Sequence, residues 1–144
     1  MKLSTKCRYG TRAMVEIARR YGQGPVKRRE IAKTQDISDS YLENILIALK
    51  HGGLIETIRG ARGGYVLKVP PGEISLLEVF NALEGPFLPV GCLDSDEICG
   101  RLDDCQTRQA WKRLQEAVES VLRKETIQSL LDDEAHNKAS NYCI

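Results

Sequence analysis

Hydrophobic residues in the first half of the chain recur at the three- and four-residue spacing of amphipathic helices. We predict a first helix over about Tyr9–Tyr21, a short second helix over Lys27–Thr34 and a third helix that opens at Ser38. The predicted inward face of the third helix consists of Tyr41, Leu42, Ile45, Leu46 and Leu49. A tight turn before the last of three helices is typical of a helix-turn-helix.

The pattern then changes from helical spacing to two short β runs. Gly52 and Gly53 are predicted to stop the third helix, and the strands flank the glycine-rich turn 59–64. Glycines there let the backbone approach a phosphate or a minor groove, and Arg59 and Arg62 add positive charge. The expected fold is therefore mainly α, a winged helix-turn-helix with a two-stranded β-wing. A solvated hairpin with incidental arginines is the alternative.

The segment Pro70–Gly72 is rich in proline and glycine, and we interpret it as a boundary before a second helical region. The capping-box pattern Ser75–Glu78 leads a fourth helix that ends near Gly85. After a long loop, a fifth helix carries the apolar stripe Ala110, Trp111, Leu114, Ala117, Val118, Val121 and Leu122. We predict that this is a long C-terminal dimerisation helix, since operators are usually bound by two-fold dimers. Burial against its own domain is the alternative, and a short sixth helix is expected over Thr126–Asp133.

Charge divides the chain at the same boundary. Residues 1–69 hold 14 Lys and Arg against 6 Asp and Glu, a balance of +8, whereas residues 70–144 hold 7 against 14, a balance of −7. A basic segment favours a polyanionic partner, and an acidic one disfavours it. We therefore expect a DNA-binding domain over 1–69 and a second region over 70–144 that carries the cysteine loop and the dimerisation helices.

Short polar side chains at the start of the third helix have the length needed to reach base edges in a major groove. The same residues could instead cap the helix, because Ser40 and Glu43 have capping-box spacing. Including the wing, the candidate DNA-binding residues are Lys6, Arg28, Ser38, Asp39, Ser40, Tyr41, Glu43, Asn44, Arg59, Arg62 and Gly63.

Three cysteines, Cys92, Cys99 and Cys105, lie in the long loop with six and then five residues between them. These gaps exceed the short spacings of zinc ribbons, so a zinc site is disfavoured. Thiolates on a flexible loop can surround an iron–sulfur cluster. From spacing alone, reactive thiols or small buried side chains are equally good interpretations.

Taken together, the motifs resemble the IscR/NsrR/CymR family of winged-helix regulators over most of the chain. The matching elements are Met1–Lys6 with Arg8 and Tyr9, Gly24–Val26, Ile31, Ser38 to Glu43, Gly53 and Leu54, Arg59 and Gly60, Gly63–Tyr65, the three cysteines and Trp111. The resemblance implies a homodimer on a palindromic operator. It also implies a 2Fe–2S or 4Fe–4S cluster in the cysteine loop near the dimer interface, and we expect 2Fe–2S. Glu43 resembles the family residue that senses base identity.

The chain departs from the IscR pattern at the fourth cluster ligand. IscR places a histidine three residues after its third cysteine, and here that position is Arg108, which cannot bind a metal. Nitric-oxide sensors of the family use a carboxylate near the N-terminus of the partner subunit, where this chain has Cys7. Cys7 is therefore a candidate ligand by location, and packing as a small apolar residue is the interpretation we prefer. The fourth ligand stays open, with Asp103, Asp104, Gln106 and Thr107 as other candidates.

We therefore expect a transcription regulator whose operator binding is controlled by an iron–sulfur cluster, with cluster-assembly genes as targets by resemblance to IscR. A thiol-redox or nitric-oxide-responsive repressor is the alternative, and a winged-helix interaction module without DNA contact is a third reading. No Cys–His pair, phosphate loop or carboxylate pair favours an enzyme. No apolar run approaches a membrane span and Met1–Leu3 opens no signal peptide, so a cytoplasmic protein is expected.

Overall fold

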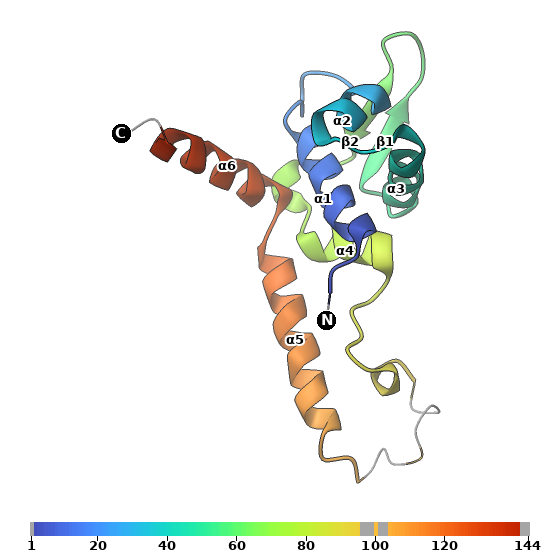
Figure 1. The fold of residues 1–144 in the computed structure, drawn as a ribbon, viewed down its shortest axis with the longest axis vertical. Helices are drawn as coiled ribbons and strands as arrows, with labels where there is room; N and C mark the ends of the chain where they lie inside the picture. Colours follow the sequence, from blue (N-terminus) through green and yellow to red (C-terminus); the bar gives the residue numbers. More distant parts are fainter. Residues whose placement is uncertain (1, 96–99, 101–103, 142–144) are drawn as a thin grey trace.

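The computed structural model describes residues 2–95, 100 and 104–141, and it places a winged-helix body at one end of an elongated molecule (Figure 1). The helices of the body are α1 (Thr5–Ala18), α2 (Arg28–Gln35), α3 (Asp39–His51) and α4 (Leu76–Glu84). The wing consists of β1 (Ile55–Ile58) and β2 (Gly64–Leu67). Helices α5 (Arg108–Lys124) and α6 (Ile127–Asn141) follow, with short 3-10 turns η1 (Pro71–Glu73) and η2 (Gly91–Leu93).

Helix α1 begins earlier than its hydrophobic spacing predicts. Ser4 occupies the N-cap, and its hydroxyl accepts a hydrogen bond from the backbone N–H of Cys7 at 3.0 Å. That bond satisfies one of the free donors at a helix start, so the helix extends four residues before Tyr9. The predicted end at Tyr21 was also too late, because the helix ends at Ala18.

The helix-turn-helix is formed by α2 and α3. Asp36 adopts the left-handed conformation (φ 52°) that ends α2, and buried Ile37 anchors the turn. On α3, Leu42, Ile45, Leu46 and Leu49 are completely buried, as predicted. Tyr41 is only half-buried and packs edge-on against Tyr9 of α1, with ring centroids 6.1 Å apart.

The alternative of a capping box at the start of α3 does not hold. Ser38 is the N-cap residue, and its side chain makes no capping hydrogen bond. Because Asp39 already lies in the helix, Ser40 falls inside the first turn and cannot cap it. Glu43 pairs with an arginine of α2 instead.

The wing is an antiparallel hairpin in which Ile55 pairs with Leu67 and Ile58 with Gly64. Gly53 adopts φ +74° between α3 and β1, a conformation that other residues rarely adopt. Tyr65 also forms a bridge with Val26, through backbone hydrogen bonds of 2.9 and 2.8 Å. The wing is therefore fixed to the segment that leads into α2.

Helix α4 begins with the predicted capping box. The Ser75 hydroxyl accepts from the Glu78 backbone N–H, and the Glu78 carboxylate accepts from the Ser75 backbone N–H at 2.8 Å. Ile74, Val79, Leu83 and Ile127 are buried in the same hydrophobic core as α1 and α3. The predicted division at residue 69 therefore separates regions of opposite charge, but it does not separate two cores.

Helix α5 extends away from the body, and the segment that follows α4 runs beside it in Figure 1. None of the residues of α5 is buried. The junction after α5 returns to the body, where Leu76 N–H donates to Glu125 at 2.8 Å and Ile127 N–H donates to Ile74 at 2.9 Å.

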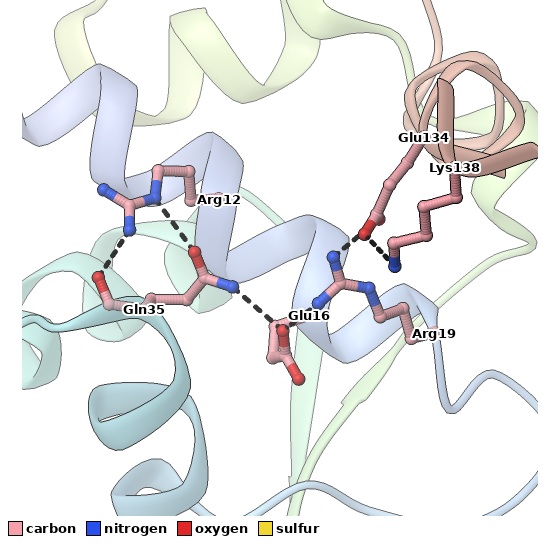
Figure 2. A network of polar contacts seen from close by, with 6 residues as sticks. All are labelled: Arg12, Glu16, Arg19, Gln35, Glu134 and Lys138. Atoms are coloured by element: carbon pink, nitrogen blue, oxygen red, sulfur yellow. Dashed lines mark hydrogen bonds and ion pairs between the residues drawn. The ribbon is translucent and has the colours of Figure 1, made fainter. Parts of the chain in front are cut away.

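Helix α6 is longer than predicted, ending at Asn141 instead of near Asp133. Polar contacts join it to the body (Figure 2). Arg19, the C-cap residue of α1, pairs with Glu16 and, at 2.6 Å, with Glu134 of α6, which also accepts from Lys138 at 2.6 Å. The lower pKa of Glu134, about 2, follows from its hydrogen bonds with Lys138 and Arg19.

The network continues from α1 into the turn of the helix-turn-helix (Figure 2). Gln35, the last residue of α2, donates to Glu16 at 2.9 Å and accepts from Arg12 at 2.9 Å. Arg12 also donates to the Gln35 carbonyl. These contacts therefore join α6, α1 and α2, which are distant in the sequence, and fix their relative positions.

Candidate DNA interface and cysteine segment

Helix α3 and the wing lie side by side at one end of the molecule (Figure 1). The predicted base-reading residues of α3, Ser38, Asp39, Ser40, Glu43 and Asn44, are all exposed. Because the opposite face of α3 fills the core, this polar face is rigidly supported. A supported, exposed helix face is what insertion into a major groove requires.

Three of the candidate residues, Arg28, Asp39 and Glu43, form one ion-pair cluster. Arg28 makes a two-pronged contact with Asp39, with Nε–Oδ1 and Nη2–Oδ2 distances of 3.0 and 2.7 Å. Its third nitrogen, Nη1, lies 2.8 Å from Glu43 Oε1. The pKa of Arg28 is raised, chiefly by the hydrogen bond with Asp39.

Lys6 lies apart from α3. Its ammonium group donates a 2.6 Å hydrogen bond to the carbonyl of Leu83, in the last turn of α4. A cation at a helix C-terminus satisfies a free carbonyl and interacts favourably with the helix dipole. Lys6 therefore stabilises α4 in this structure, and its contact with DNA stays a prediction.

The wing turn presents its arginines to solvent and buries Gly63. Residues 58–62 are exposed, including Arg59 and Arg62, whereas Gly63 is buried. A Cβ at Gly63 would overlap the Ile58 carbonyl, and Gly63 N–H donates to Gly60 at 3.0 Å. Gly63 therefore shapes the turn, and DNA contact by Gly63, Arg59 and Arg62 stays a prediction.

Two of the three loop cysteines lie in described segments. Cys92 is in η2 and Cys105 precedes α5, and both are partly exposed, whereas Cys99 lies outside the described residues. Arg108, the first residue of α5, donates to the Cys92 carbonyl at 3.4 Å. The side chain at the position of the expected histidine therefore joins the cysteine segment to α5.

The surroundings of Cys105 favour its thiolate. Its Sγ lies 3.4 Å from Thr107 Oγ1, and this hydrogen bond, with the Arg108 backbone N–H, lowers the pKa of Cys105. Within the described parts of the chain, no three potential metal ligands come together. Two partly exposed cysteines beside a guanidinium do fit a thiolate-bound group, because the cation offsets thiolate charge.

Cys7 has the opposite environment. It is buried in α1 at 6% exposure, and burial, reinforced by Glu84, raises its pKa. A buried, protonated thiol is a poor metal ligand. The structure therefore favours packing over cluster ligation for Cys7 within this chain.

Most of the apolar stripe of α5 is exposed, and only Val118 and Leu122 of it are half-buried. Trp111, Leu114 and Val121 are 41, 38 and 61% exposed. A groove of about 440 Å³ lies between Trp111, Leu114 and residues 87–90, and a shallow apolar one follows Ala117 to Leu122. No residue of the stripe is fully buried against its own domain, so the structure does not support that alternative.

Two contacts were missed by sequence reasoning. The interaction of Arg28 with Glu43 joins different helices, and sequence spacing carries no signal for it. The bond from Arg108 to Cys92 was also missed, although a basic residue at the start of a helix, where positive charge is unfavourable, was a usable signal.

Comparison with known proteins agrees with this architecture. Residues 3–133 match the family model Rrf2, described as an iron-dependent transcriptional regulator. The transcriptional regulator CymR of Bacillus subtilis is 40% identical over 130 residues, 90% of this chain and 89% of CymR. No helix among the described residues has the length and hydrophobicity needed to cross a membrane.

Solved structures give the same result. The solved structure of CymR, the global cysteine regulator of B. subtilis, is similar to this chain with a TM-score of 0.77 and 39% identity. The match covers 90% of this chain and 95% of the CymR chain. IscR of T. potens is similar with a TM-score of 0.77 and 33% identity, covering 93% and 88%. The chain is a winged-helix protein and belongs to the Rrf2 family of transcriptional regulators.

Proposed function

We propose that the protein is a homodimeric, cytoplasmic regulator whose binding to a pseudo-palindromic operator is controlled by an iron–sulfur cluster held by Cys92, Cys99 and Cys105. The bond from Arg108 to the Cys92 carbonyl carries the proposal. It connects the cysteine segment to the first turn of α5, the helix with the uncovered apolar face. A change at the cysteines can therefore alter how two copies are held.

The dimer is supported by the exposure of Trp111, Leu114 and Val121. Packed against the same face of a second α5, these side chains leave water, and each fully buried large side chain contributes about 1.5–3 kcal/mol. The two copies of α3 would then contact half-sites about one DNA turn, roughly 34 Å, apart. Because this spacing is strict, a small change in dimer geometry changes operator affinity.

The cluster is supported by the chemistry of its expected ligands. Thr107 and Arg108 favour the thiolate of Cys105, and thiolates are the usual ligands of iron–sulfur clusters. When bound, a 2Fe–2S cluster supplies an iron centre that changes charge with oxidation state. Arg108 then holds η2 against α5. Iron–sulfur cluster assembly genes are the proposed targets.

Anaerobic purification tests the proposal. We expect brown protein with visible absorbance and stoichiometric iron and sulfide, and Mössbauer spectra identify the cluster type. The DNA probe is the duplex most enriched when the protein selects from a random-core pool. Cluster loss should change affinity for this duplex in the native protein. Replacing Cys92, Cys99 and Cys105 by alanine should remove both the colour and this response. Cys143→Ala, which changes a cysteine near the C-terminus outside the loop, serves as control. Anaerobic protein without iron contradicts the cluster.

A thiol-redox switch is the second candidate. It is favoured by the partial exposure and lowered pKa of Cys105. The similarity to CymR, the global cysteine regulator of B. subtilis, also favours it. It predicts colourless anaerobic protein with intact thiols, whose affinity for the selected duplex changes with peroxide and recovers with dithiothreitol. Cys105→Ser should abolish this response, and Cys7→Ser should leave it intact.

A further inference from the structure

One guanidinium lies between two carboxylates at the start of α3. Asp39 and Glu43 are four residues apart and so lie on one face of the helix. Arg28, the first residue of α2, contacts Asp39 through Nε and Nη2, and Glu43 through Nη1. The cluster therefore links the starts of both helices of the helix-turn-helix on the exposed side of α3.

The cluster solves an electrostatic problem of this face. Asp39 and Glu43 together place two negative charges where α3 meets a polyanion, and like charges four residues apart also repel each other. Arg28 reduces the local charge to −1. All three of its nitrogens contact carboxylates, so in this arrangement the guanidinium is directed at α3 and not at a phosphate.

The contact also restricts the side chain of Glu43. Glutamate has several rotatable bonds, and fixing such a chain costs up to about 2 kcal/mol of conformational entropy. Arg28 holds Oε1 at 2.8 Å, so the carboxylate is oriented before DNA arrives. An oriented carboxylate can accept a hydrogen bond from cytosine N4 and discriminate against bases without that amine.

We propose that Arg28 is a positioning residue that sets base specificity by holding Glu43 in the orientation that reads cytosine. The inference rests on the proposed DNA-reading function of α3 and names a determinant of its specificity. The competing role for Arg28 is a direct phosphate contact. That role would strengthen binding to every sequence and leave base preference unchanged.

The test compares Arg28→Gln with Arg29→Gln. Arg29 is the exposed neighbour in α2, and no ion pair involves it within the described structure, so its variant removes the same charge without touching the cluster. Each full-length protein selects from a random-core duplex pool. The position read by Glu43 is the one whose preference Glu43→Gln changes.

We expect Arg28→Gln to lower the preference for cytosine at that position about fivefold or more, as for loss of one good base contact. Arg29→Gln should leave this preference unchanged. Arg28→Lys keeps the charge but cannot hold both carboxylates in a fork, so it should lose the preference too. If circular dichroism shows that the Arg28→Gln variant is unfolded, the base preference of the Arg28→Lys variant tests the inference instead.

A double-mutant cycle separates the two roles. If Arg28 acts through Glu43, adding Arg28→Gln to Glu43→Gln causes no further loss of base preference. The inference is overturned if the Arg28→Gln variant keeps the full preference for cytosine and instead lowers the slope of log affinity against log salt by about 0.9. This lower slope would appear both in the wild-type background and in the Glu43→Gln background. A Glu43→Gln variant that changes preference at no position also overturns the inference. A wild-type protein that enriches no sequence overturns the DNA-reading function itself.

Discussion

The winged-helix body and helix α5 carry equally regular hydrophobic stripes, but only the first stripe is buried within the chain. On α3, Leu46 and Leu49 are completely covered, whereas Leu114 and Val121 of α5 are 38 and 61% exposed. Sequence periodicity indicates which face of a helix is apolar, and it does not indicate what covers that face. In the body the cover is the same chain, and for α5 we propose a second copy.

The largest difference should appear on truncating one leucine in each region. Leu46→Ala leaves a cavity in the core and should cost about 2–5 kcal/mol of unfolding free energy. Leu114→Ala should cost less than about 1 kcal/mol in dilute protein, because its side chain already contacts water there. Urea unfolding at low protein concentration measures both values. Equal losses would mean that α5 is buried within the monomer.

A charge on the apolar face of α5 should separate folding from assembly. Val121→Asp should yield a folded monomer and weaken binding to the selected duplex at least about 100-fold, because the second half-site is no longer held nearby. Sedimentation velocity and mobility shifts measure the two effects. Gln109→Asp adds the same charge on the polar face and serves as control. A Val121→Asp variant that remains dimeric places the interface elsewhere.

Ser75 and Ser40 both have capping-box spacing, but only Ser75 caps a helix, so their contributions to stability should differ. Ser75→Ala removes the hydroxyl that caps α4 and should cost about 1 kcal/mol. Ser40→Ala should change stability by less than about 0.5 kcal/mol, because no capping bond is lost. Thermal unfolding decides. Equal losses would support the alternative in which Ser40 caps α3.

The wing arginines should affect DNA binding without affecting the core. Arg59 is exposed, so Arg59→Ala should leave stability unchanged. It should weaken binding to all duplexes and lower the slope of log affinity against log salt by about 0.9, the value for one phosphate contact. Salt titrations of the selected duplex and of a scrambled duplex measure this. An unchanged slope removes Arg59 from the interface.

The smallest effect is expected where α6 meets α1. The pKa of Glu134 is lowered from 4.5 to about 2, so its ion pairs stabilise the fold above about pH 4.5 and this stability is lost as the pH falls toward 2. Because the side chain is about one-third exposed (32%), the contribution should be below about 1 kcal/mol. Glu134→Gln should lose it at pH 6 and match the wild type near pH 2. A constant difference between the two proteins across this range would contradict the assignment.

Features determined by neighbouring residues were predictable from the sequence. The buried stripe of α3, the Ser75 cap and the glycine stop at Gly53 all follow from residues within one or two turns. The true length of α6 was not predictable, since Arg19 supports it through a contact with Glu134 across the sequence. The contact of Arg28 with Glu43 was missed for the same reason.

The cysteine segment was predictable only as a set of residue types. The spacing of Cys92 and Cys105 left a cluster, reactive thiols and small buried side chains as equal interpretations, and the lowered pKa of Cys105 favours the first two. Packing of Cys7 as a small apolar residue was the preferred prediction and is confirmed by its 6% exposure, whereas the proximity of Glu84 from α4 was not predictable from the sequence. The contact of Arg108 with Cys92 depends on how the long loop returns to α5.

The junction at Glu125 and Ile127 gives α5 the mechanics of a lever. Two backbone hydrogen bonds fix this end to Leu76 and Ile74, while the other end begins beside Cys105. At 1.5 Å per residue, α5 is about 25 Å long, so a tilt of about 5° about the junction moves its far end by roughly 2 Å. A movement of roughly 2 Å at the end of α5 near Cys105, about the length of one bond to iron, is therefore enough to tilt the whole helix.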